Sequence, residues 1–202
     1  MRVGIFGGTF DPVHIGHIKM AEYAKDEFAL DKIVFVPNAN PPHKKDKNIE
    51  DYSHRFKMLK LAVGEKSFFS VSDYESESGK YYYSLHTMRH FREIYGKETY
   101  FIIGGDSLTT IDRWYEYETL LKENKFIVFK RNDSRGFCDA VDKYRALGAE
   151  IHVSDMEEIV VSSTDVRKDI KSAGNNGILC ADVYEYIAKA GLYGGSYDTG
   201  RD

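Results

Sequence analysis

Short apolar segments alternate along the chain with segments in which apolar residues recur at helical spacing. Runs of roughly 4–8 apolar residues between turn signals are typical of buried strands, and spacings of three and four residues are typical of amphipathic helices. The pattern predicts strands at residues 2–6, 32–36, 68–71, 99–103, 125–129 and 150–153. It predicts helices at residues 15–30, 51–63, 85–95, 136–147, 164–172 and 181–190.

This alternation predicts an α/β fold. Strands separated by helices form a parallel sheet that is covered on both faces, so we expect a Rossmann-like, doubly wound parallel sheet in a single domain. The domain is expected to span residues 1–194, followed by a polar tail at 195–202. Ligands bind such sheets beyond the carboxyl ends of the strands. Polar, glycine-rich segments follow four predicted strands, at 7–8, 37–47, 104–107 and 162–164, and we expect them to converge at that edge.

Composition narrows the classes of function. The 28 Lys and Arg against 32 Asp and Glu give a net charge of −4, which argues against a nucleic-acid-binding protein. Cys138 and Cys180 are too few for a disulfide framework or a cysteine-rich metal site. Because no apolar leader and no apolar stretch of about 20 residues occurs, we expect a cytoplasmic protein without a membrane segment. The oligomeric state stays open, a homo-oligomer included.

The segment from Gly4 to His17 is the most informative one, because it reads as a strand, a glycine turn and the start of a helix. Backbone N–H groups in such a turn and at a helix N-terminus bind phosphate, and Gly7 and Gly8 let the main chain approach it. His14 and His17 share one helix face. The segment is neither of the common glycine-rich nucleotide motifs, and it lacks the spacing and the glutamate of zinc-protease helices. It therefore predicts a phosphate site and no metal site.

The stretch Gly7-Gly8-Thr9-Phe10-Asp11-Pro12-Val13-His14-Ile15-Gly16-His17 resembles the N-terminal motif of the nucleotidyltransferases with an H-x-G-H element. More narrowly, it resembles that of the bacterial nicotinate mononucleotide adenylyltransferases. Residues 161–167 resemble the I-S-S-T-x-[IV]-R element of the same superfamily, and residues 184–193 resemble the closing Y-I-x-x-x-G-L-Y of the nicotinate enzymes. The resemblance extends from residue 3 to residue 193.

The resemblance implies an ATP site whose phosphates contact His14, His17, Lys44 and Arg167 as catalytic groups. The residues expected to bind ATP are Gly7, Gly8, Thr9, Phe10, Gly104, Asp106, Ser162, Ser163 and Thr164. From the residues alone, a carboxylate after a strand suits ribose hydroxyls, which makes Asp106 a candidate. Arg167 lies one turn into a helix whose first N–H groups can bind the same anion. Ser163 or Thr164 could instead serve only as a helix cap.

Other segments indicate where the mononucleotide binds. Residues 41–44, Pro-Pro-His-Lys, resemble the family's substrate loop, which implies a phosphate contact for Lys44. Residues 102–114 resemble the family's I-G-x-D-x-x-x-x-L-x-x-W segment, which implies that Trp114 lies near the nicotinate. An indole can stack on a pyridine ring, but burial in the core is the alternative. Arg131 follows a strand where relatives have an arginine before a proline, which makes it a further candidate phosphate contact.

The pyridine end departs from the family pattern. Residues 82–88 resemble the stretch Y-T-x-D-T-[LM], whose first threonine helps to hold the pyridine carboxylate. Ser84 takes that place and keeps the hydroxyl, although it could also serve as an N-cap. His86 stands where relatives have an acidic residue, and Thr110 where they often have an aromatic one.

The resemblance implies that AMP moves from ATP to nicotinic acid mononucleotide, giving nicotinic acid adenine dinucleotide and pyrophosphate in NAD biosynthesis. We expect direct in-line attack without a covalent enzyme intermediate, with Mg²⁺ bound together with ATP. Both partners are then small molecules. One alternative is a related transferase with another phosphorylated acceptor, nicotinamide mononucleotide or phosphopantetheine. The other is a nucleotide-binding module without catalysis.

Overall fold

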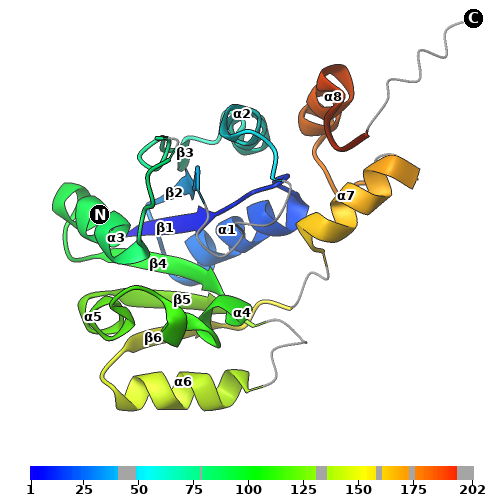
Figure 1. The fold of residues 1–202 in the computed structure, drawn as a ribbon. Coiled ribbons are helices and arrows are strands. Elements are labelled where there is room, and N and C mark those ends of the chain that lie inside the picture. The colour runs from blue at the N-terminus through cyan, green and yellow to red at the C-terminus, as the bar shows by residue number, and fades with distance from the viewer. Residues whose placement is uncertain (41–48, 78, 131–135, 158–160, 173–175, 195–202) are drawn as a thin grey trace, which may run out of the picture.

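The computed structural model describes residues 1–40, 49–77, 79–130, 136–157, 161–172 and 176–194 (Figure 1). The strands are β1 (Val3–Gly8), β2 (Lys32–Pro37), β3 (Phe69–Val71), β4 (Thr99–Gly104), β5 (Lys125–Phe129) and β6 (Glu150–Ser154). The helices are α1 (Ile15–Glu27), α2 (Tyr52–Val63), α3 (Ser84–Tyr95), α4 (Gly105–Leu108), α5 (Tyr117–Glu123), α6 (Phe137–Ala146), α7 (Ser163–Ser172) and α8 (Ala181–Ala190). Two 3₁₀ turns, η2 (Ile111–Arg113) and η3 (Leu192–Gly194), complete these elements.

The strands form one parallel sheet in the order β3-β2-β1-β4-β5-β6. In the register of the central strands, Val3 lies opposite Lys32 of β2 and Thr99 of β4. The expected single-domain, Rossmann-like α/β fold is confirmed. The order reverses between β1 and β4, so the crevice that binds ligands in such sheets lies beyond the ends of these two strands.

Helices cover both faces of the sheet (Figure 1). Val3 and Ile5 of β1 belong to the apolar core beneath α3, α5 and α6. Phe6, which points to the opposite face, belongs to the core formed with α1, α2, α7 and α8. Because both faces of each central strand are buried, the strands are continuous apolar runs, which is why the hydrophobic pattern located them.

The predicted elements are present, with shifted ends. Helix α1 ends at Glu27 and not at residue 30, because Ala29 takes a left-handed conformation with φ 47°. Helix α3 begins at Ser84, and its N-cap residue is Tyr83, so the interpretation of Ser84 as an N-cap is wrong. Helix α5 was not predicted at all.

The loop between β1 and α1 has an unusual backbone at Phe10, with φ 50°. A positive φ in a non-glycine residue costs on the order of 1–3 kcal/mol and persists only where packing enforces it. The Phe10 ring is buried, and it packs edge-on against Phe6 at 5.6 Å and His17 at 5.1 Å between ring centroids. Aromatic packing therefore holds the turn that follows β1.

A buried arginine ties this loop to two other segments. Arg55 of α2 is only 1% exposed, and its guanidinium donates to the carbonyls of Thr9 at 2.6 Å and Glu50 at 2.8 Å. A longer bond of 3.5 Å reaches the carbonyl of Ala39, beyond β2. Burial lowers the pKa of Arg55 from its ordinary value. These bonds fix the loops after β1 and β2 relative to each other.

The C-terminal end of the described chain returns to the same loop. The Tyr193 hydroxyl donates to Asp11 Oδ1 at 2.6 Å, and the backbone N–H of Glu50 donates to the same oxygen at 3.3 Å. Burial raises the pKa of the Tyr193 hydroxyl, and the Asp11 carboxylate raises it further. The 3₁₀ turn η3 thus helps to hold Asp11 in place.

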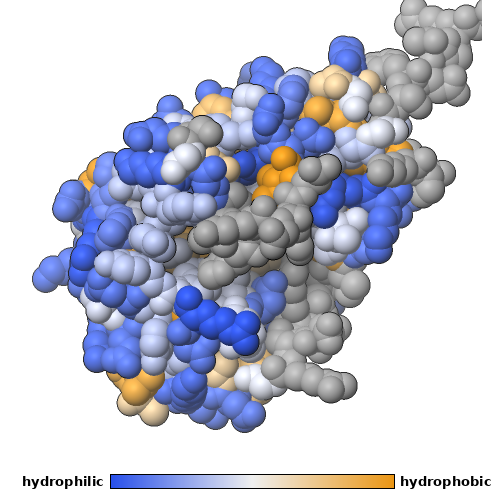
Figure 2. Space-filling view, viewed as in Figure 1, coloured by the Kyte–Doolittle hydropathy of each residue, from blue (hydrophilic) through white to orange (hydrophobic). Residues whose placement is uncertain are grey.

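None of the described helices is long and apolar enough to cross a bilayer. The face shown in Figure 2 is largely hydrophilic, with apolar residues in small groups between charged ones. Such scattered apolar residues are ordinary on a protein surface.

Replacing Arg55 with methionine is expected to lower the free energy of unfolding by about 2–4 kcal/mol, because the part-buried carbonyls of Thr9, Glu50 and Ala39 lose their donor. Urea unfolding followed by circular dichroism measures the change. Lys57→Ala, at an exposed position of the same helix, is the control and should stay within about 0.5 kcal/mol of the parent. An Arg55→Met variant as stable as the parent would contradict the assigned role.

Candidate active site

Two cavities lie side by side at the carboxyl ends of β1 and β4. The first has a volume of about 380 Å³ and is lined largely by aromatic and aliphatic side chains, so we call it the aromatic cavity. The second, of about 330 Å³, is lined by histidines, serines, aspartates and an arginine, and we call it the polar cavity. They share the wall formed by Phe6, Gly7, Gly8, Thr9, Gly104 and Ser107. Both volumes suit small-molecule ligands.

Two glycines of the shared wall lie in close contact with neighbouring side chains. A Cβ atom at Gly8 would lie 2.9 Å from the Phe10 ring, and one at Gly104 would lie 2.5 Å from Asp106 Oδ1. Larger residues would displace these side chains into the cavities. The boundary between the two cavities therefore includes the backbone of Gly7, Gly8 and Gly104, which a ligand can approach closely.

The two histidines begin helix α1. His14 is its N-cap residue, and its backbone N–H donates to Nδ1 of His17 at 3.2 Å. The ring centroids lie 3.8 Å apart, with His14 buried and His17 half-buried in the polar cavity. Because Nδ1 of His17 accepts this bond, the neutral ring carries its proton on Nε2. This atom is the hydrogen-bond donor that His17 can offer a ligand.

Arg167 of α7 enters the polar cavity from the opposite side and is anchored to the loop after β1. Its Nη1 donates to the carbonyl of Asp11 at 2.5 Å and lies 3.6 Å from Asp11 Oδ2, while Nη2 donates to Thr164 Oγ1 at 3.3 Å. A guanidinium has five N–H donors, so these two bonds leave others for an anion. The bonds fix the position of the group before any ligand binds.

The start of α7 is capped by Ser162. Its Oγ accepts from the Asp165 backbone N–H at 3.2 Å and donates to the Asp165 carboxylate at 2.5 Å. The interpretation of Ser163 or Thr164 as the cap is therefore wrong. Ser163 instead donates to the carbonyl of Pro12 at 3.0 Å, which is a second contact between α7 and the loop after β1.

The structure brings most of the expected site residues together. Twelve of the residues expected to contact ATP line the polar cavity. They are Gly7, Gly8, Thr9, Phe10, His14, His17, Gly104, Asp106, Ser162, Ser163, Thr164 and Arg167. Ser84 and Trp114 line the aromatic cavity. Lys44 and Arg131 lie outside the described residues.

Both interpretations of Trp114 have structural support. The side chain is half-buried and packs against Phe101 at 6.3 Å between ring centroids, yet it also lines the aromatic cavity. Beside it, the exposed rings of Tyr83 and Tyr115 stack at 4.3 Å with an interplanar angle of 25°. The cavity thus offers aromatic surfaces from two segments of the chain.

The other departures from the family pattern lie outside this cavity. His86 packs edge-on against Tyr115 at 5.6 Å, on the exposed side of α3. Thr110 is exposed and donates to the carbonyl of Asp106 at 3.1 Å. Neither belongs to the described residues that line the aromatic cavity.

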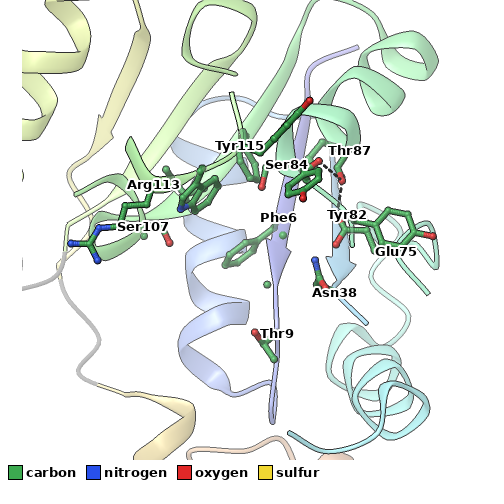
Figure 3. A pocket seen from close by; sticks show the side chains of 18 residues that line it. Phe6, Thr9, Asn38, Glu75, Tyr82, Ser84, Thr87, Ser107, Arg113 and Tyr115 are labelled. Carbon is green, nitrogen blue, oxygen red and sulfur yellow. Dashed lines mark hydrogen bonds between the residues drawn. The ribbon is translucent and has the colours of Figure 1, made fainter. Parts of the chain in front are cut away.

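Sequence reasoning missed Glu75, a buried acid on the wall of the aromatic cavity (Figure 3). Thr87 of α3 donates to its carboxyl at 2.5 Å, and the Asn38 side chain lies beside it. Burial raises the pKa of Glu75 to about 7 in spite of the hydrogen bond from Thr87. No sequence signal marks this residue, because the acidic residues around it read as an exposed loop.

It also missed the residues that hold the polar cavity together. Asp11 lies inside the glycine motif, between residues that were assigned, so its place in the motif was the available signal. Arg55 precedes the buried Met58 and Leu59 by three and four residues, which puts a charge on the apolar face of α2. Tyr193 belongs to the closing segment that resembles the nicotinate enzymes.

The described residues contain no cluster of three or more His, Cys, Asp or Glu side chains arranged to hold a metal ion. The polar cavity has two carboxylates, Asp11 and Asp106. Asp11 is engaged by Tyr193 and Arg167, whereas Asp106 is exposed. The chain alone therefore offers few ligands to a cation at this place.

Known proteins share both the sequence and the fold. The family model described as "Cytidylyltransferase-like" matches residues 5–169. A probable nicotinate-nucleotide adenylyltransferase of Desulfitobacterium hafniense is 39% identical over 197 residues, 95% of each chain. One of Moorella thermoacetica is 39% identical over 203 residues, 95% of this chain and 91% of the relative.

Among solved structures, the Plasmodium falciparum nicotinic acid mononucleotide adenylyltransferase complexed with NaAD has the same fold. Its TM-score is 0.81, with 20% identity, and the match covers 98% of this chain and 99% of that one. At this identity the likeness supports the architecture alone, whereas the bacterial relatives align over nearly the whole chain. The chain therefore belongs to the cytidylyltransferase-like family and, within it, to the nicotinate-nucleotide adenylyltransferases.

Proposed function

We propose that the protein transfers AMP from ATP to nicotinic acid mononucleotide, giving nicotinic acid adenine dinucleotide and pyrophosphate. The observation that carries the proposal is the pair of cavities with a shared glycine wall. One is polar, with His14, His17 and Arg167, and suits a triphosphate. The other is aromatic and suits a pyridine ring. Relatives that align with 95% of this chain carry the corresponding name.

In this proposal the polar cavity binds ATP. The backbone N–H groups of residues 7–10 and of the first turn of α7 donate to phosphate oxygens, aided by the positive ends of the α1 and α7 dipoles. His14 and His17 donate to the α- and β-phosphates, and Arg167 neutralises further charge. Asp106, at the end of β4, accepts from ribose hydroxyls.

The aromatic cavity binds the mononucleotide, with its phosphate at the shared wall. Trp114 stacks on the pyridine ring, and the Ser84 hydroxyl donates to the pyridine carboxylate. Lys44 and Arg131, which lie outside the described residues, remain predictions as phosphate contacts.

The reaction needs no strong base. An oxygen of the mononucleotide phosphate, already anionic near neutral pH, forms a bond to the α-phosphorus of ATP. The bond to the β-phosphate oxygen breaks on the opposite side, and pyrophosphate leaves with the electron pair. Catalysis then comes from positioning and from stabilising charge on the phosphate oxygens. No covalent enzyme intermediate forms.

Mg²⁺ fits this site as a companion of ATP. It prefers oxygen ligands and keeps several waters, so phosphate oxygens and water can supply most of its ligands where the protein offers few. Of the two carboxylates that line the polar cavity, the exposed Asp106 would be the one to coordinate the ion. When bound, the ion neutralises triphosphate charge.

Pyrophosphate release tests the proposed function. We expect release with ATP, Mg²⁺ and nicotinic acid mononucleotide, and slower release at pH 6.5 when nicotinamide mononucleotide or phosphopantetheine replaces it. A coupled colorimetric assay measures the rate, with ATP alone as the control. Faster release with another acceptor would point to the related transferase, and no release with any acceptor would favour the binding module.

His17→Ala is expected to lower kcat by about 10²–10³-fold, because it removes one preorganised donor to the transition state. Circular dichroism should show the parent's helical content. Lys19→Ala, at an exposed position of the same helix, provides the matched control and should keep the parent's kcat. Turnover near the parent's value in His17→Ala would remove His17 from the catalytic groups.

Trp114 is the only tryptophan, so its fluorescence reports on the aromatic cavity. Nicotinic acid mononucleotide is expected to quench its emission, because the pyridine ring stacks on the indole. ATP, which is assigned to the polar cavity, should change the emission less. An unchanged spectrum at saturating mononucleotide, with binding verified by calorimetry, would leave Trp114 with a packing role alone.

A further inference from the structure

The Glu75 carboxyl is the buried acid of the aromatic cavity. It is 6% exposed and is held from two sides of the cavity. Thr87 Oγ1 of α3 donates to the carboxyl at 2.5 Å, and the Ala39 N–H, beyond β2, donates to the Glu75 backbone carbonyl at 3.0 Å. Figure 3 shows Glu75 beside Asn38, Tyr82 and Thr87 at one end of the cavity.

The groups that face Glu75 from its neighbouring elements are neutral. Thr87 donates a hydrogen bond to the Glu75 carboxyl, and the neutral Asn38 side chain lies beside it. Tyr52 of α2 interacts with it electrostatically, and burial raises the pKa of this hydroxyl to about 12. Burial likewise raises the pKa of Tyr74, the residue before Glu75, so that both phenols stay protonated at neutral pH.

No cation pairs with Glu75 among the described residues. Arg55 is occupied by the carbonyls of Thr9 and Glu50. Arg113 lines the cavity at the other end and points away from Glu75 in Figure 3. Lys80 is exposed and lies over the Tyr82 ring, and Asp73 is exposed on the loop before Glu75. Within the described part of the chain, the charge at this end of the cavity therefore depends on Glu75 itself.

We propose that Glu75 is a specificity-determining residue whose protonation state decides whether the cavity accepts the acid or the amide form of the pyridine mononucleotide. The proposal rests on the proposed function, because it places the pyridine substituent in the aromatic cavity.

The chemistry of the two substituents supports this assignment. A nicotinate carboxylate only accepts hydrogen bonds, so it fits beside a protonated Glu75 and is repelled by an ionised one. A nicotinamide group has two N–H donors, which an ionised Glu75 can accept. Burial raises the pKa of Glu75 to about 7, so both states occur near neutral pH. Binding of the acid above this pH then takes up a proton at Glu75.

The test measures the dissociation constants of nicotinic acid mononucleotide and nicotinamide mononucleotide at pH 6.5 and 8.5 by calorimetry. For the acid we expect a rise on the order of tenfold at pH 8.5, because only the protonated fraction of the protein binds it. For the amide we expect no rise. The phosphate that both ligands carry titrates alike, so it cancels in the ratio of the two constants.

Glu75→Gln keeps the acceptor for Thr87 and removes the titration. Its acid-to-amide ratio should be the same at both pH values. Glu77→Gln, an exposed neighbour that pairs with Lys80, is the matched control and should keep the parent's pH dependence. A residue that only supports the fold, or that binds the ribose, would weaken both ligands equally at both pH values.

A pH-independent ratio in the parent protein, or an unchanged pH dependence in Glu75→Gln, would overturn the inference. Pyrophosphate release from the same samples separates the two proposals. If pyrophosphate is released but the acid-to-amide ratio of dissociation constants does not change with pH, only the proposed role of Glu75 is overturned. The expected ratios without release support that role and overturn the proposed reaction, and binding of neither mononucleotide overturns both.

Discussion

The loop between β1 and α1 must satisfy its buried polar groups by contacts with distant parts of the chain, and the rest of the site depends on this constraint. Arg55 of α2 binds the Thr9 carbonyl, Ser163 and Arg167 of α7 bind the carbonyls of Pro12 and Asp11, and Tyr193 binds the Asp11 carboxylate. The same loop supplies the glycine wall and leads into the two histidines. The polar cavity is therefore complete only where the C-terminal segments pack against this loop.

This arrangement has a consequence for catalysis. The guanidinium of Arg167 is held by Asp11 and Thr164, and the His17 ring is held by the His14 backbone. Groups fixed in this way need little reorganisation when charge develops on a transferring phosphoryl group, and this is the condition under which such donors are most effective. The Asp11 carboxylate lies 3.6 Å from Arg167, so it offsets part of the positive charge while it fixes its position. The Asp11 carboxylate therefore fixes the position of Arg167 but weakens the attraction of its guanidinium for an anionic ligand.

Sequence patterns predicted the elements and motifs that are encoded by neighbouring residues. They missed the features that arise when segments distant in sequence pack together. The central strands were predictable because both of their faces are buried, and the grouping of glycines and histidines in the polar cavity because these residues are close together in sequence. Helix α5 was not, since it has only Leu120 and Leu121 as buried residues and starts after Glu116 in a left-handed conformation. Glu75 was not predictable either, because its burial is created by α3 and the loop after β2, which are distant in sequence.

The shared wall explains why two substrates of opposite character can react in one crevice. Gly7 and Gly8 end β1, and Gly104 ends the neighbouring β4, so the reversal of strand order opens the sheet just where side chains are absent. Most of the aromatic residues lie on one side of this boundary, and the histidines, Asp11, Asp106 and Arg167 lie on the other. A phosphate attached to an aromatic ring would therefore reach the wall from one side and a triphosphate from the other. In the proposed reaction they would meet beside the backbone of Gly7, Gly8 and Gly104, which can donate hydrogen bonds to both.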